Sequence, residues 1–281
     1  KYIQTALQLN LFRFYRDIYS FNTADYDLVI TDFEPLSARI ARRNKLPLIG
    51  IGHQYAFVHD IPVEGGNPLA RFVIQNYAPA DFPVGLHWHH FEQPILPPII
   101  PNNIKQDRST LKNKIIVYLP FEQSNDIISL LSDFQSYEFY IYHRFKQAND
   151  KRNMHLRPYS RTGFLNDLAE SNGVICNAGF ELVSEALHLG KKILVKPLAG
   201  QMEQLSNAMV VSLLKLGMAM KHLDKNKVVE FLDTPARSAI KYPDVAHVIA
   251  NWVDAGNWED LEGLADSAWQ QITLPANGFT S

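Results

Sequence analysis

Apolar residues in this chain gather in short runs, and between the runs they recur with helical spacing. Residues 27–32 and 46–52 are runs rich in Leu, Val and Ile, which is typical of strands buried on both faces. Residues 35–44, between the two runs, place their apolar side chains on one face of a helix. A strand, a helix and a second strand at this spacing predict a parallel sheet.

Three further elements are expected in the first hundred residues. They are a helix over 2–19, a helix over 68–78 and a strand over 84–91. Residues 94–103 then contain four prolines, and proline both ends helices and lacks the amide that a strand donates. We therefore place a boundary between about 98 and 112, which divides the chain into domains 1–104 and 105–281.

Strands and helices alternate more regularly after this boundary. The expected strands are 114–119, 138–143, 154–158, 173–176 and 193–196. The expected helices are 124–134, 162–171, 180–189 and 201–216, with closing helices around 225–232, 243–254 and 258–271. Such alternation predicts a doubly wound α/β domain, in which ligands bind beyond the carboxyl ends of the strands.

Composition excludes several classes of protein. The length of 281 residues fits two domains, and 46% of the residues are apolar, which is enough for buried cores. A net charge of −2 gives no basis for a nucleic-acid-binding surface. The single cysteine, Cys176, rules out an intramolecular disulfide and is expected to be a small core residue. No apolar run approaches the ~18 residues that cross a bilayer.

The clearest chemical signal lies between residues 173 and 190. A short apolar strand ends at Cys176, the turn Asn177-Ala178-Gly179 follows, and a helix begins near Phe180. The first turn of a helix has unpaired N–H groups that carry partial positive charge, so it suits a pyrophosphate. Gly179 has no Cβ to block the approach of such a group.

Polar residues after this turn could bind a sugar and a ribose. Glu185 lies in the second turn of the helix, where a carboxylate could accept both hydroxyls of a ribose or could simply be solvated. Glu203, Gln204 and Asn207 follow the next strand, and neutral amides both donate to and accept from sugar hydroxyls. Each of these residues alone is also compatible with an ordinary surface position.

The whole string from Asn177 to Asn207 resembles the C-terminal signature of GT-B glycosyltransferases. The shared features are Asn-Ala-Gly, Glu185 six residues later, Gly190, Pro197, Glu203-Gln204 and Asn207-Ala208. The string is similar to the bacterial peptidoglycan N-acetylglucosaminyltransferase and to nucleotide-diphosphate-sugar transferases more widely. It resembles most closely an uncharacterised bacterial and archaeal GT-B family.

This resemblance implies a role for each position. The amides around Gly179 and Phe180 would hold the diphosphate, and Glu185 would accept the ribose diol. Glu203, Gln204 and Asn207 would contact the donor sugar. Phe164 and the main chain of Leu165 would lie against the base, which is usually uracil in such sites.

One segment departs from the family pattern. Relatives carry a glycine-rich turn after the first strand of this domain, whereas residues 119–124 here contain no glycine. Ser124 could still cap the next helix and offer its hydroxyl. Lys196, at the end of an apolar strand, is a candidate counter-charge for phosphate.

The first domain offers fewer candidates for catalysis. Asp32 ends a predicted strand, His53 ends the next one, and Glu34 lies beside Asp32. Inverting transfer needs a general base for the acceptor. No βα unit with a glycine-rich loop precedes Asp32, so we expect an N-terminal segment, and the family's usual histidine base, to be missing. Asp32 and His53 are then partners of that base, the base itself, or ordinary strand-end residues.

Two other patterns admit structural explanations. On a strand, His87 and His89 would point to one face and His90 to the other, but no carboxylate or cysteine accompanies them and we assign no metal site. The aromatic residues within 12–19 are typical of helix packing. A peripheral membrane contact through them stays open, because the acceptor could be linked to a lipid.

The sequence therefore predicts a GT-B fold, with two Rossmann-like domains facing a cleft and the N-terminal one incomplete. The predicted function is inverting, metal-independent transfer of a hexosyl or N-acetylhexosaminyl group from a UDP-sugar, as substrate rather than cofactor, to an unknown carbohydrate, lipid or small-molecule acceptor. A cytoplasmic location and no nucleic-acid partner are expected. A nucleotide-sugar 2-epimerase and a non-catalytic nucleotide-sugar-binding protein are the alternatives.

Overall fold

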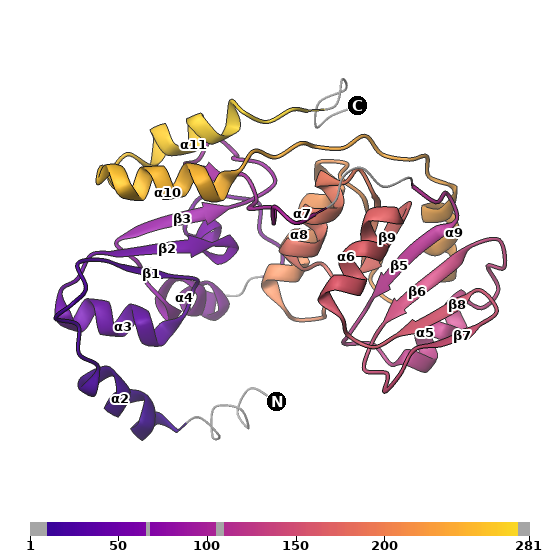
Figure 1. The fold of residues 1–281 in the computed structure, drawn as a ribbon, viewed down its shortest axis with the longest axis horizontal. Coiled ribbons are helices and arrows are strands. Elements are labelled where there is room, and N and C mark those ends of the chain that lie inside the picture. Colours follow the sequence, from indigo (N-terminus) through magenta and orange to yellow (C-terminus); the bar gives the residue numbers. More distant parts are fainter. Residues whose placement is uncertain (1–9, 66–67, 105–109, 275–281) are drawn as a thin grey trace. The chain divides into compact units, whose positions relative to one another are not determined.

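The computed structural model describes residues 10–65, 68–104 and 110–274, which form parts of two compact units (Figure 1). The first unit comprises the described parts of 1–61, 67–97 and 249–266, and the second comprises those of 62–66, 98–248 and 267–281. Residues 249–266 therefore group with the first unit, whereas the sequence-based division gave all residues after 105 to one domain.

The first unit contains a parallel four-stranded sheet in the order β1-β2-β3-β4. The strands are β1 (Val29–Thr31), β2 (Leu48–Gly52), β3 (Phe82–Leu86) and β4 (Ile95–Leu96). The helical segments are α2 (Leu11–Ser20), α3 (Pro35–Asn44), the 3-10 helix η1 (His53–Val58), α4 (Pro68–Tyr77), and most of α10 (Val245–Ala255) and α11 (Leu261–Trp269). Figure 1 shows α3 and α10 on opposite sides of this sheet.

The second unit contains a seven-stranded sheet in the order β11-β10-β9-β5-β6-β8-β7, in which only the pairing of β7 with β8 is antiparallel. The strands are β5 (Lys114–Tyr118), β6 (Glu138–Tyr142), β7 (Asn149–Lys151), β8 (Met154–Arg157), β9 (Gly173–Cys176), β10 (Lys192–Val195) and β11 (Met218–Ala219). The helices are α5 (Ser124–Leu131), α6 (Arg161–Glu170), α7 (Phe180–His188), α8 (Met202–Leu213) and α9 (Lys225–Asp233).

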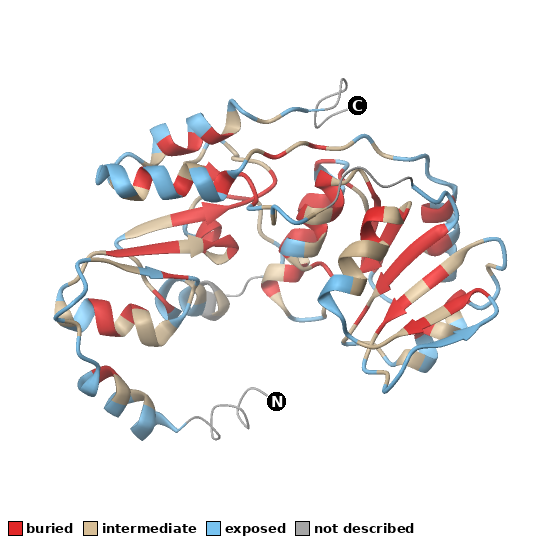
Figure 2. Ribbon diagram, in the orientation of Figure 1, coloured by how far each residue is buried: buried red, intermediate tan, exposed pale blue. Residues whose placement is uncertain are grey.

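Apolar side chains of this second sheet form a continuous core with α5 and α9. Ile115 and Ile141 of the central strands pack with Ile127 of α5 and Phe231 of α9 in one cluster of buried residues. Figure 2 shows the central strands buried along almost their full length. Burial on both faces explains why these strands appear in the sequence as continuous apolar runs.

Strand order locates the crevice of the second unit. From β5 the chain continues to β6 and β8 on one side, and later returns to β9 and β10 on the other side of β5. The order of the strands therefore reverses between β5 and β9, and ligands of open α/β sheets bind outside the carboxyl ends of the strands at such a point.

Some predicted elements need correction. Strand β3 ends at Leu86, so the residues from His87 to His90 lie in a loop, and the alternation of faces assumed for them was wrong. Strand β4 lies within the proline-rich segment, where the two residues between Pro94 and Pro97 form an edge strand. Of the helix expected over 2–19, residues 1–9 lie outside the described residues. No helix in the described part of the chain has the length and apolar content needed to cross a membrane.

Candidate functional site

The turn between β9 and α7 leaves the start of a helix open. Gly179 is the N-cap residue of α7 and, as a glycine, brings no side chain of its own to cap the helix. A Cβ built on Gly179 would have no atom within 4 Å, so the space beside this residue is open. The first N–H groups of α7 have no partner within the helix and carry its positive dipole end, which suits an anion.

Two asparagines hold this turn in place. Nδ2 of Asn207 donates to the carbonyl of Ala178 at 3.0 Å, and Nδ2 of Asn177 donates to the carbonyl of Lys196 at 2.8 Å. Asn177 is only 7% exposed, and its Oδ1 is buried without a hydrogen-bond partner among the described residues. A buried acceptor without a donor is uncommon in native proteins and is explained when a ligand or water supplies that donor.

Glu185 carries the second unsatisfied group of the site. Its side chain is half-buried on α7, and its carboxylate has no hydrogen bond or ion pair within the described residues. Burial raises the pKa of Glu185 to about 7, while Arg161 lowers it and Glu181 raises it further. A carboxylate that is removed from water without donors is unfavourable, so this group is suited to accept hydroxyl donors from a ligand.

Helix α8 brings the predicted sugar-binding residues to the same unit. Oε1 of Gln204 accepts from the amide of Leu198 at 3.0 Å, which fixes the loop before α8. Nε2 of Gln204 has no partner in the described part of the chain and can therefore serve as a donor. Glu203, in the first turn of α8, is partly exposed. Asn207 is fully buried and donates to the Ala178 carbonyl. Its side chain therefore positions the turn between β9 and α7.

The residues expected at the base lie on α6. The rings of Phe164 and Tyr118 meet edge to face with their centroids 5.5 Å apart, and Tyr118 is the last residue of β5. Leu165 lies inside α6 between Arg161 and Glu170, where main-chain groups bond along the helix. The expected contact between the main chain of Leu165 and the base stays a prediction. The helix is capped by Ser160, whose Oγ accepts from the Gly163 amide at 3.1 Å.

The loop after β5 differs from its predicted role. Ser124 is the first residue of α5 and Gln123 is the N-cap, so Ser124 does not cap the helix as expected, and no side chain does. Lys196 is not a free counter-charge either, because its Nζ pairs with Oε1 of Glu122 at 2.6 Å. The ion pair joins the loop after β5, which carries Glu122, to the loop after β10, which carries Lys196.

The candidates of the first unit follow two neighbouring strands, β1 and β2. Asp32 comes directly after β1 and is exposed, and a Cβ added to Gly52 would lie 3.1 Å from its Oδ1. Burial raises the pKa of Tyr55 to about 12, and the nearby Asp32 charge contributes to this shift. Glu34 caps α3 instead, since its two carboxylate oxygens accept from the amides of Leu36 and Ser37 at 2.8 and 2.7 Å.

His53 is held inside the first unit. It begins η1 after β2, is 4% exposed, and its Nδ1 lies 2.8 Å from the carbonyl of Leu86. A carbonyl only accepts, so Nδ1 carries the proton and, in a neutral ring, Nε2 does not. The His87 ring lies 5.1 Å away, and burial lowers its pKa well below the usual range.

Sequence reasoning missed two features of the second unit. Tyr118 ends β5 and Glu122 lies in the loop after it, at the point where the strand order reverses, so the rule that ligands bind beyond strand ends could have indicated them. Hydrogen bonds between Ser206 and the main chain of Glu64 were not predictable, because these residues lie far apart in the sequence.

A parallel sheet and a mainly parallel one, each with helices between its strands, together with a helix start at the switch point of the second sheet, are typical of the GT-B class of α/β proteins. Residues 8–235 match the model of glycosyl transferase family 1, and the chain belongs to this family. No curated protein matches the chain.

Solved structures with the same fold include glycosyltransferases of diverse sources. The glycosyltransferase of kitacinnamycin is 13% identical with a TM-score of 0.53, over 92% of this chain and 76% of that one. LpCGTa in complex with UDP is 14% identical with a TM-score of 0.54, over 80% and 72%. UGT89C1 of Arabidopsis thaliana, complexed with UDP-L-rhamnose, is 13% identical with a TM-score of 0.52, over 87% and 66%. At these identities the likeness concerns the fold.

Proposed function

We propose that the chain transfers a sugar from a UDP-sugar to an acceptor, with the donor bound in the second unit. The observation that carries this proposal is the turn between β9 and α7. The space beside Gly179 at the start of α7 is open, the side-chain oxygen of Asn177 in the turn is unsatisfied, and Glu185 presents a half-buried carboxylate on α7. Amides that can bind phosphate lie close in sequence to oxygen atoms that can accept hydrogen bonds from hydroxyls. This combination matches the diphosphate and the ribose of a nucleoside diphosphate.

Each group then acts on one part of the donor. The α7 amides take up the negative charge that develops on the leaving diphosphate, which lowers the barrier to transfer. Glu185 accepts the ribose hydroxyls, while Nε2 of Gln204 and the Glu203 carboxylate contact the sugar. The aromatic edges of Phe164 and Tyr118 provide a surface for the base. UDP is the proposed nucleotide because LpCGTa and UGT89C1, of similar fold, were solved with UDP and UDP-L-rhamnose.

Acceptor activation is assigned to the first unit. Asp32 is the best placed of its candidates, since it is exposed at the carboxyl end of β1 and its carboxylate caps no helix. His53 is buried, and its fixed Nδ1–H supports a positioning role. Glu34 is the weakest candidate, because both of its oxygens cap α3. A general base in this place would receive the acceptor proton as the sugar is transferred with inversion.

Product analysis tests this proposal. The protein is incubated with UDP-glucose or UDP-N-acetylglucosamine, with and without a panel of phenolic, carbohydrate and lipid acceptors, and the sugar and UDP are quantified. We expect UDP release that depends on the acceptor, together with a glycosylated product. A new nucleotide sugar without acceptor would indicate an epimerase, and binding without either product would indicate a non-catalytic protein.

A further inference from the structure

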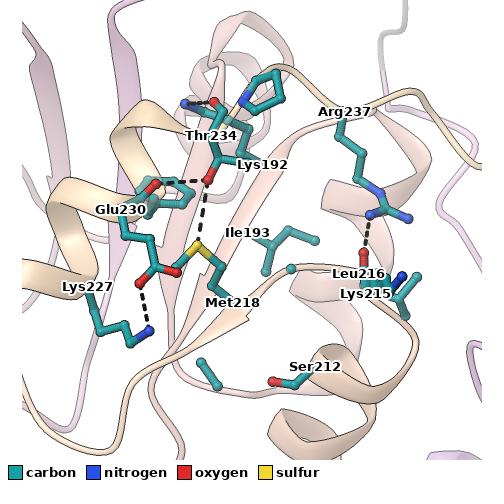
Figure 3. A pocket seen from close by; sticks show the side chains of 14 residues that line it. Lys192, Ile193, Ser212, Lys215, Leu216, Met218, Lys227, Glu230, Thr234 and Arg237 are labelled. Atoms are coloured by element: carbon teal, nitrogen blue, oxygen red, sulfur yellow. Dashed lines mark hydrogen bonds and ion pairs between the residues drawn. The ribbon is translucent and has the colours of Figure 1, made fainter. Parts of the chain in front are cut away.

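A cavity of about 380 Å³ lies in the second unit, apart from the turn between β9 and α7 (Figure 3). It is formed by the start of β10, the end of α8, β11, α9 and the segment after α9. Ser212 of α8 lines it, whereas Glu203 of the donor site lies nine residues earlier on the same helix, about 14 Å along its axis. The cavity is therefore a separate place.

The charge of the lining is strongly positive. Four cationic side chains line the cavity, and Glu230 is the one acidic residue among the lining residues. The cations are Lys192, Lys215, Lys227 and Arg237. Glu230 is paired with Lys227 at 2.6 Å. In Figure 3 this pair lies on one side of the cavity, and Arg237 lies with Lys215 on the other.

Two of these cations are short of acceptors. Nη1 of Arg237 donates to the carbonyl of Lys215 at 2.8 Å, but its Nε is buried without a partner among the described residues. Lys192 is 4% exposed, and its Nζ donates to the carbonyls of Leu232 and Thr234, each at 2.9 Å, which uses two of its three hydrogens. Burial lowers the pKa of both groups, as expected for charges held away from water.

The rest of the lining is largely apolar. It includes Ile193, Leu216, Met218, Phe231 and Pro235. The volume falls within the range of pockets that bind small molecules, which combine an apolar wall with a few polar groups. In such surroundings a cation attracts an anion more strongly than it does in water.

We infer that this cavity binds a small organic anion, with a phosphate or carboxylate group at Arg237 and Lys192 and a compact apolar body against Met218 and Phe231. The bound acid supplies an acceptor to the buried Nε of Arg237 and to the third Nζ hydrogen of Lys192. The apolar body displaces water from the apolar wall, so both parts contribute to affinity. This site does not depend on the proposed function of the donor site.

Methyl NMR of the full chain, labelled at its methionine methyl groups, tests the inference. Met218 lines the cavity, while the other methionines, among them Met154 and Met202, do not and serve as references. Phenyl phosphate, benzoate and neutral benzyl alcohol are titrated in turn. We expect phenyl phosphate or benzoate to shift the Met218 signal to saturation, and benzyl alcohol to bind at least about tenfold more weakly.

Charge variants make the test specific. Arg237→Gln should weaken binding of the anion about tenfold or more, and Lys215→Gln about threefold, with the fold checked by thermal unfolding. Lys215→Gln keeps the backbone carbonyl that Arg237 contacts, so it remains informative if Arg237→Gln does not fold. Lys225→Gln is the matched control, because Lys225 is on α9 but pairs with Asp133 outside the cavity lining.

Three results would overturn the inference. One is the absence of a Met218 shift with either anion up to about 10 mM, which exceeds the Kd of a weak ligand. Another is equal affinity for benzyl alcohol, which would make the site merely apolar. The third is an equal response of Lys215→Gln and Lys225→Gln, which would assign the effect to overall charge.

Discussion

Glu185 shows how a single residue can oppose stability while serving a ligand. Its folded pKa is about 7, above the ordinary value of 4.5, because burial disfavours the charged form. The folded state therefore holds the proton more tightly than the unfolded state. The stability that this provides is complete below about pH 4.5 and is lost as the pH rises towards 7.

We predict that Glu185→Gln stabilises the protein at pH 8 by about 1–2 kcal/mol, after allowance for partial exposure, and has little effect at pH 4. Urea unfolding at the two pH values measures this difference. Glu181→Gln is the matched control, since Glu181 is exposed on the same helix and its charge contributes least to the pKa shift of Glu185, so its removal should give a much smaller gain. An equal effect of both substitutions at both pH values would contradict the assignment.

Substitutions of the two carboxylates after β1, Asp32 and Glu34, should distinguish a catalytic role from a structural one. We predict that Asp32→Asn lowers turnover by about 10²–10⁴-fold without weakening UDP binding, as for loss of a general base. Glu34→Ala should instead cost about 1 kcal/mol of stability through the lost cap of α3, with turnover nearly unchanged. Turnover from UDP release and stability from urea unfolding provide the two measurements. The reverse pattern would exchange their roles.

At the residue scale, sequence predicted the strand, turn and helix that position the candidate residues, but not which of their polar atoms already have partners in the fold. Asn177, Gly179 and Glu185 all lie where the motif indicated, since strand–turn–helix geometry fixes them locally. Lys196 is paired with Glu122, which lies 74 positions earlier, and no local pattern reveals such a partner. The roles assigned to these residues remain predictions.

At the scale of elements, a short segment from the first half of the chain is fastened to the donor-side helix α8. The amide of Glu64 donates to Oγ of Ser206 at 3.0 Å, and this hydroxyl donates to the Glu64 carbonyl at 3.3 Å. Gly65 has a φ of +72°, and a Cβ there would meet Cδ1 of Leu205 at 2.4 Å. Glycine thus permits the close approach of residues 64–65 to α8.

We predict that Ser206→Ala increases hydrogen exchange of the Glu64 amide about fivefold or more, because a hydrogen bond worth about 1 kcal/mol is lost. Hydrogen–deuterium exchange with mass spectrometry measures this effect. Ser212→Ala is the control, since Ser212 lies on the same helix but bonds to the Ala208 carbonyl. Unchanged exchange at Glu64 in the Ser206 variant would contradict the contact.

Sequence patterns predicted the longer elements better than the short ones. Helix α3 begins and ends where its apolar spacing indicated, because Glu34 caps its start and Lys45 adopts a left-handed conformation at its end. Strands β4, β7 and β11 escaped prediction. They have two or three residues each, and every residue of β7 is exposed, so they lack an apolar run.

At the scale of the whole molecule, the two units are not simple halves of the chain. Residues 62–66 group with the second unit and residues 249–266 with the first. The proline-rich segment indicated a boundary between the units, but no local pattern in the sequence shows that the chain returns to the first unit at residue 249. The place of Trp258 beside Phe82, with ring centroids 5.7 Å apart, depends on contacts across more than half of the sequence.

The likeness to peptidoglycan N-acetylglucosaminyltransferase is a finer statement than membership of glycosyl transferase family 1, and it stays a prediction. The family match covers residues 8–235 and therefore includes the whole stretch from Asn177 to Asn207. The identity of the sugar and of the acceptor depends on side chains that differ among proteins of one fold.

Isothermal titration of the intact protein with UDP tests the central claim most directly. We predict one UDP bound per chain, with affinity about tenfold to a hundredfold lower in Glu185→Gln, which loses a charge-assisted acceptor. Glu181→Gln, one turn earlier on α7, should bind as the wild type does. No UDP binding, or equal affinity in all three proteins, would contradict a donor site at the start of α7.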